Sequence, residues 1–132
     1  MKPRIVSALS FLALVALPCV ALAGCSSGGS DGGGTVPANA TVIRAIDGIA
    51  WDAKTYTATA VDGKVTISLK DDSSLPHNLH LVGADDVDVG VSLDVQGKGD
   101  SHTEQITLAP GEYRVICTIA GHGNMKATLT VT

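Results

Sequence analysis

The segment from Cys117 to Met125 places three side chains with metal-binding chemistry within nine residues. They are the thiol of Cys117, the imidazole of His122 and the thioether of Met125, and a second imidazole lies upstream at His77 in a Pro-His-Asn sequence. Sulfur donors suit Cu(I), and imidazole nitrogen is tolerated by Cu(II). Two histidines, one cysteine and one weak methionine therefore predict a site for a copper ion that changes its oxidation state.

Zinc is the main alternative ion for these side chains. A structural zinc site takes four strong ligands, usually with two or more cysteines or additional histidines, and the thioether of Met125 is a poor zinc ligand. Each candidate taken alone has a structural explanation, because a single cysteine often packs as a small apolar residue. A shared metal explains why all of them occur together.

The pattern of apolar residues predicts an all-β domain in residues 40–132. Short runs of alternating apolar and polar residues recur there, and no run shows sustained helical periodicity. Turn-forming glycine and proline separate the runs. We expect a Greek-key β-sandwich or barrel of about seven to eight antiparallel strands. The expected strands are residues 41–46, 55–60, 64–70, 77–82, 87–95, 103–108, 112–117 and 125–131.

The strand pattern also predicts where the candidate ligands point. Alternate side chains of a strand face opposite sides of its sheet. His77, Cys117 and Met125 each have the parity of the apolar residues in their own strand, so all three are expected on the buried face. His80 has the opposite parity, and His102 lies far from either motif. We therefore expect both of these histidines to lie outside the metal site.

The start of the chain resembles the export signal of a bacterial lipoprotein. Residues 1–24 combine two positive side chains, an apolar run and small residues before Cys25, which is the pattern of a lipobox. The resemblance implies cleavage before Cys25 and lipid attachment to it, and an uncleaved membrane anchor is the alternative. Residues 25–39 are rich in Gly and Ser and are expected to form a flexible tether. The folded domain is expected at residues 40–132.

Cysteine use and charge narrow the possible functions. The chain has three cysteines, so loss of the signal and lipidation of Cys25 would leave Cys117 alone in the domain. A lone thiol is unusual in an exported protein, where disulfides are favoured. Removal of Lys2 and Arg4 with the signal leaves 7 basic against 13 acidic side chains, a net charge of −6. This acidity argues against nucleic acid as a partner.

Residues 40–132 resemble the cupredoxins, the plastocyanin/azurin-like family of type 1 blue-copper proteins. The resemblance rests on segment 71–78 (Asp-Asp-Ser-Ser-Leu-Pro-His-Asn), segment 109–113 (Ala-Pro-Gly-Glu-Tyr) and the Cys–His–Met order of segment 117–125, which segment 126–131 follows. It implies one copper ion bound by His77, Cys117 and His122 as strong ligands, with Met125 as the weak axial ligand.

The resemblance also implies that Asn78 hydrogen-bonds across to the cysteine-bearing strand. The chain departs from the family pattern in the length of the loop between His122 and Met125. Cupredoxins usually have three or four residues between the second histidine and the methionine, whereas this chain has two, Gly123 and Asn124. Gly123 can adopt a positive φ, which would make this short return possible. A backbone carbonyl or solvent is the alternative axial ligand to Met125.

The function that the resemblance implies is the shuttling of single electrons between extracytoplasmic redox partners, such as a cytochrome or a terminal oxidase or reductase. The protein is expected to be a monomer, lipid-anchored to the cell envelope and facing the periplasm or the cell exterior. We expect no enzyme activity, because a catalytic copper needs further histidines and only His80 and His102 remain. The alternatives are a lipoprotein that stores or delivers copper without redox turnover, and a metal-free interaction domain.

Overall fold

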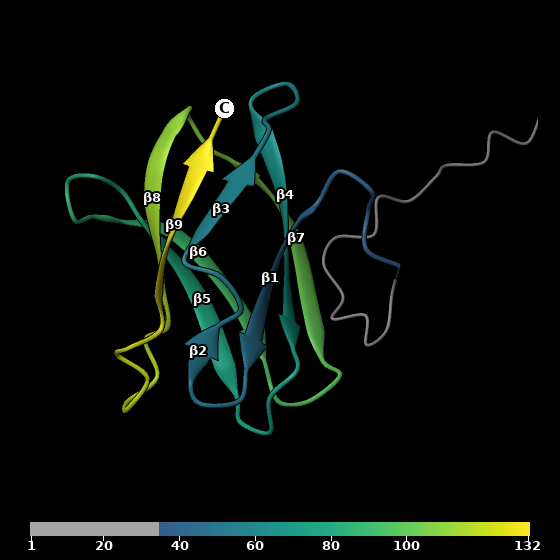
Figure 1. The fold of residues 1–132 in the computed structure, drawn as a ribbon. Coiled ribbons are helices and arrows are strands. Elements are labelled where there is room, and N and C mark those ends of the chain that lie inside the picture. The colour runs from purple at the N-terminus through teal and green to yellow at the C-terminus, as the bar shows by residue number, and fades with distance from the viewer. Residues whose placement is uncertain (1–34) are drawn as a thin grey trace, which may run out of the picture.

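A computed structural model describes residues 35–132 of the chain (Figure 1). The expected signal peptide, the lipidation site Cys25 and most of the expected tether lie outside these residues. Two β-sheets face each other in the described part, with the hydrophobic core between them. No helical segment within residues 35–132 has the length and hydropathy of a membrane span.

The sandwich has one sheet of four strands, in the order β2-β1-β4-β7, and one of five, in the order β3-β9-β8-β5-β6. The nine strands of the described residues are β1 (Thr41–Ile46), β2 (Ala50–Trp51), β3 (Thr55–Ala58), β4 (Lys64–Asp71), β5 (His77–Val82), β6 (Asp88–Val95), β7 (Ser101–Thr107), β8 (Gly111–Ile116) and β9 (Lys126–Val131).

The all-β sandwich expected from the sequence is confirmed, and each of the expected strands is present with ends shifted by no more than two residues. The pattern missed β2, because a strand of two residues is too short to show alternation. Two strand pairs, β1–β4 and β3–β9, are parallel, which differs from the antiparallel pairing expected throughout. In both pairs the intervening chain passes through other strands, so no hairpin forces the partners to run in opposite directions.

The core forms from the inner faces of the two sheets. In β4, Val65, Ile67 and Leu69 are all buried, and in β5 both Leu79 and Leu81 have no exposed surface. Burying a side chain of this size contributes about 1.5–3 kcal/mol. The packing of alternating residues from both sheets holds the strand ends in place, and these ends carry the candidate metal ligands.

One end of the sandwich collects the segments that carry metal-binding side chains. The loop between β4 and β5 and the loop between β8 and β9 both lie at the lower end in Figure 1. At the opposite end of the sandwich, where β8 starts, the Tyr113 hydroxyl donates a hydrogen bond of 2.9 Å to the Ala109 carbonyl oxygen. This contact resembles the tyrosine corner of other β-sandwiches and anchors the start of the strand that leads to Cys117.

Candidate metal centre

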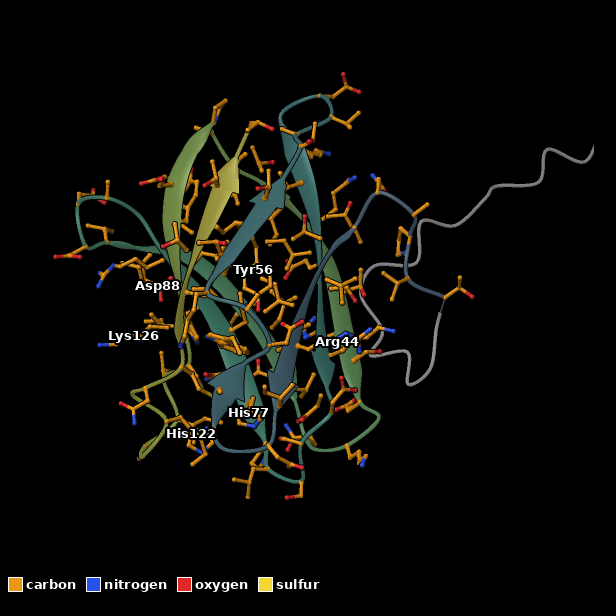
Figure 2. All side chains as sticks on the ribbon, viewed as in Figure 1. Arg44, Tyr56, His77, Asp88, His122 and Lys126 are labelled. Atoms are coloured by element: carbon orange, nitrogen blue, oxygen red, sulfur yellow. The ribbon has the colours of Figure 1, made fainter. Side chains whose placement is uncertain are left out.

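Three of the predicted ligands meet at this end of the sandwich. His77 begins β5, Cys117 follows β8, and His122 lies in the β8–β9 loop. One donor atom from each lies within 4.8 Å of the others, and no second group of this kind occurs in residues 35–132. The Cys117 Sγ lies 3.6 Å from His122 Nδ1, and the two imidazole centroids are 4.8 Å apart. Figure 2 shows His77 and His122 next to one another at the lower end of the molecule.

The β8–β9 loop is built from two successive turns that present His122. In the first turn the His122 amide donates a hydrogen bond of 3.0 Å to the Ile119 carbonyl. Gly121, the third residue of this turn, has a φ of 89°, a conformation that favours glycine. Gly123 does not use the positive φ that is open to a glycine there. The left-handed residue is needed before His122, where the chain first reverses, and not in the return to β9.

The second turn brings Met125 back to the cysteine. The Met125 amide donates to the His122 carbonyl at 2.9 Å, and the Cys117 amide donates to the Met125 carbonyl at 3.4 Å, which closes the base of the loop. The Met125 side chain is only 1% exposed. The short spacing from His122 is thus accommodated by one hydrogen-bonded turn, and Met125 packs in the core beside Cys117.

A hydrogen bond with the hydroxyl group of Ser73 holds His77 in place. Its Nε2 lies 2.8 Å from the Ser73 Oγ, and the same Oγ lies 2.8 Å from the Asp71 Oδ1. A serine hydroxyl has one proton, and a carboxylate is its strongest acceptor here. When Ser73 donates to Asp71, it accepts from His77, so His77 carries its proton on Nε2. The Nδ1 of His77 then has a free lone pair, and this buried atom has no hydrogen-bond partner within the described residues.

The three donor residues are almost fully buried, and this burial keeps His77 in the form that binds a metal. His77, Cys117 and His122 are 1%, 6% and 7% exposed. Burial lowers the pKa of His77 below its ordinary value; the Asp71 carboxylate opposes this shift, and the neighbouring His122 adds to it. A lowered pKa keeps the imidazole neutral, which is the form that binds a metal.

The chemistry of this cluster fits copper. A buried nitrogen without a partner costs free energy unless something binds it, so the open Nδ1 of His77 is accounted for by a metal ion. One thiolate and two imidazoles are the trigonal donors of a type 1 copper site, with a methionine as the weak further ligand. In residues 35–132 only three strong ligands gather, one fewer than structural zinc takes.

Asn78 connects the two ligand-bearing strands. Its Nδ2 donates a hydrogen bond of 2.8 Å to the Thr118 Oγ1, and its Oδ1 accepts one of 2.8 Å from the Thr118 amide. Asn78 follows His77 and Thr118 follows Cys117. The amide group therefore fixes the separation of the two ligand positions.

The other two histidines of the domain lie outside the cluster. The His80 Nδ1 is 2.9 Å from the Asp88 Oδ2, and the His102 Nδ1 accepts a hydrogen bond of 3.0 Å from the Asp94 amide. Both are only partly buried, whereas His77 is fully buried. Strand parity thus separated His77 from His80 correctly.

Sequence reasoning assigned no role to Asp71 and Ser73, which support His77. A signal for Asp71 was present, because it continues the inward series of β4 after Ile67 and Leu69 and is therefore a carboxylate at a core position. Ser73 lies in the irregular chain between β4 and β5, where no periodicity indicates the direction of a side chain.

Comparisons with known proteins support the fold. No protein-family model and no curated protein matches this chain. Among solved structures it is similar to auracyanin A, a "blue" copper protein from the green thermophilic photosynthetic bacterium Chloroflexus aurantiacus, at 22% identity and a TM-score of 0.58, over 70% of this chain and 98% of that one.

Two further structures show the same likeness. An azurin from the obligate methylotroph Methylomonas sp. strain J has 17% identity and a TM-score of 0.58, over 73% of this chain and 99% of its own. A purple cupredoxin from Nitrosopumilus maritimus has 16% identity and a TM-score of 0.54, over 69% of this chain and 98% of its own. None of the three is named for an enzyme activity. The described domain thus has the cupredoxin fold and, at one end of its sandwich, the donor set of a type 1 copper site.

Proposed function

We propose that this protein carries single electrons between extracytoplasmic redox partners by means of one type 1 copper ion. The observation that carries the proposal is the buried cluster of Cys117, His77 and His122, in which the His77 Nδ1 is left open. Bound copper supplies the redox chemistry by alternating between Cu(I) and Cu(II). His77, Cys117 and His122 are the proposed strong ligands, and Met125 is the proposed axial ligand.

The chain contributes a frame that changes little between the two oxidation states. His77 is fixed by Ser73, the Cys117 and Met125 positions are joined through the backbone, and Asn78 ties Thr118 to β5. Ligands held in this way do not rearrange when an electron arrives, and a rigid supporting shell is what a working metal site needs. Such a site favours fast electron exchange.

His122 is the proposed point of electron entry and exit. Of the two histidines it is the more exposed, at 7% against 1% for His77. Small or apolar residues surround this end, including the exposed Ala120 and the exposed Leu75 of the β4–β5 loop. An apolar rim of this kind suits a small and brief contact with a redox partner. A cytochrome or a terminal oxidase or reductase is the partner class that we propose.

The protein is proposed to work as a monomeric carrier and not as an enzyme. A copper centre that transforms a substrate needs histidines beyond those of the electron-transfer site. The two spare histidines of the described domain, His80 and His102, are engaged by Asp88 and by the Asp94 amide. They do not form a second group of metal ligands within residues 35–132.

The proposed location is the cell envelope. The lipobox-like sequence before Cys25 supports lipid anchoring, and the Gly/Ser-rich residues 25–39 would then let the domain move over the membrane surface. The domain would face the periplasm or the cell exterior. Labelling with a lipid precursor, with Cys25→Ala as the control, tests the anchor: the label is expected on the wild type and absent from the variant.

Storage or delivery of copper without redox turnover is the second candidate function. It is favoured only by the presence of a copper-type donor set, and the near-complete burial of the ligands opposes it. The two functions are separated by mixing the copper-loaded protein with a reduced cytochrome in a stopped-flow instrument. A carrier loaded with Cu(II) is expected to take one electron rapidly from each cytochrome, which leaves Cu(I) and oxidised cytochrome, whereas a storage protein binds copper but exchanges no electron.

A further inference from the structure

We propose that Asp71 is a positioning residue for the ligand His77 and acts on it through the hydroxyl of Ser73. The inference rests on the proposed copper site. A carboxylate oxygen, a hydroxyl and an imidazole nitrogen follow one another at 2.8 Å and 2.8 Å. Asp71, Ser73 and His77 are 1%, 2% and 1% exposed, so water does not compete for these hydrogen bonds.

The backbone holds Asp71 firmly in place. The Asp71 amide donates to the Asp100 carbonyl at 2.9 Å, and the Asp71 carbonyl accepts from the Gly99 amide at 2.8 Å. The Oδ1 of Asp71 also accepts a hydrogen bond of 2.9 Å from the Ser73 amide. Two hydrogen bonds from Ser73 thus converge on one carboxylate oxygen, which fixes where the hydroxyl sits relative to His77.

A carboxylate at this position is costly to bury. The second oxygen, Oδ2, is buried without a partner in the described residues, and so is the indole nitrogen of Trp51. Asp71 and Trp51 are both cross-strand neighbours of Ala45, one on each side. An apolar residue at position 71 would pack with Leu69 at no such cost. The carboxylate is therefore explained by what it does for His77 and not by packing.

The chain of contacts has two effects on His77. The Ser73 oxygen accepts a hydrogen bond from the Nε2–H of His77, which holds the tautomer with the Nδ1 lone pair open. The negative charge behind Ser73 makes the imidazole more basic, and partners of this kind typically change metal affinity by about 10–100-fold when removed. Greater basicity favours the more highly charged Cu(II) over Cu(I), so Asp71 is expected to lower the reduction potential.

The test uses the full-length protein with two variants and two matched controls. Ser73→Ala removes the bridging hydroxyl, and Ser74→Ala is its control at an exposed serine next to it. Asp71→Asn removes the buried charge, and Asp72→Asn removes a charge from an exposed neighbour. In the copper-free protein, ¹⁵N NMR reports which nitrogen of His77 carries the proton. In the copper-loaded protein, competition titration and voltammetry report Cu(II) affinity and reduction potential.

We expect Ser73→Ala to lose the fixed Nε2–H tautomer and to bind Cu(II) about 10–100-fold more weakly than Ser74→Ala. Asp71→Asn is expected to have a more positive potential than Asp72→Asn. Equal tautomers and affinities in the two serine variants, or equal potentials in the two aspartate variants, would overturn the proposal. If Asp71→Asn does not fold, the comparison of Ser73→Ala with Ser74→Ala in tautomer and Cu(II) affinity still tests the proposal. A wild type that binds no copper refutes the proposed function, and the tautomer measurement then still tests the contact.

Discussion

The side chain of Asn78 makes two hydrogen bonds of 2.8 Å with Thr118, one through each of its amide atoms. These two residues directly follow His77 and Cys117, which lie in different segments of the chain. The side-chain amide of Asn78 both donates and accepts, so it adds one more hydrogen-bonded pair between β5 and the residue that follows Cys117 at the end of β8. The distance between an imidazole and a thiol is thereby set by a contact that is not itself part of the metal site.

Replacing Asn78 by Ala is expected to lower the free energy of unfolding by about 1–3 kcal/mol, because two hydrogen bonds are lost and the Thr118 amide is left without its partner. Urea unfolding of the copper-free protein measures this change. Asn124→Ala, at an exposed asparagine of the β8–β9 loop, is the control and should cost much less. Equal costs in the two variants would show that the Asn78–Thr118 contact contributes nothing.

Replacing Tyr113 by Phe removes the hydrogen bond to the Ala109 carbonyl and keeps the ring. The expected loss in the free energy of unfolding is about 0.5–1.5 kcal/mol, the range for one hydrogen bond. Because Tyr113 is distant along β8 from Cys117, the absorption spectrum of the copper-loaded protein should not change. A changed spectrum would mean that the corner at Ala109 influences the ligand loop.

Replacing Met125 by Leu tests whether the thioether is the axial ligand. Leucine has a similar volume, so the buried site should lose less than about 1.5 kcal/mol of stability. Although its sulfur is soft, a further donor stabilises the more highly charged Cu(II) more than it stabilises Cu(I). Loss of this donor should therefore make the reduction potential more positive. An unchanged potential in a folded, coloured Met125→Leu variant would assign the axial position to a backbone carbonyl or to solvent.

The stability of the copper-free protein is expected to fall when the pH drops below about 6.5. An imidazole in the unfolded chain takes up a proton near this pH, whereas the pKa of His77 in the folded protein is lower, mainly because of burial. Between these two values the unfolded state binds more protons, so acid favours unfolding. Urea midpoints at about pH 7.5 and about pH 5.5 measure the loss. The difference should be smaller in His77→Asn, and an identical difference would contradict this assignment.

The fold could be predicted from the sequence because apolar and polar residues alternate along most of its strands. In β4 and β5 the residues of one parity are buried, and this parity placed His77 on the inner face and His80 away from it. The two-residue strand β2 could not be found in this way, because alternation needs more residues than it has. The relative direction of paired strands could not be predicted either, because alternation is the same in parallel and antiparallel pairs.

The ligand set could be predicted because its residue types carry specific chemistry, but the parts that support it could not. The turn glycine is Gly121 and not Gly123, a choice that depends on where the loop must reverse. The hydroxyl of Ser73 reaches His77 across an irregular segment, so only three-dimensional geometry shows the contact.

The most direct test of the account is a titration of the full-length protein with Cu(II), followed by visible absorption spectroscopy of the wild type and of Cys117→Ser. The serine variant keeps the size of the side chain and the two histidines but removes the thiolate. We predict an intense absorption band in the wild type at one equivalent of copper, as expected for a bond between Cu(II) and a thiolate, and none in the variant. A wild type that stays colourless, or a Cys117→Ser variant with the same band, would contradict the assignment of a type 1 copper site.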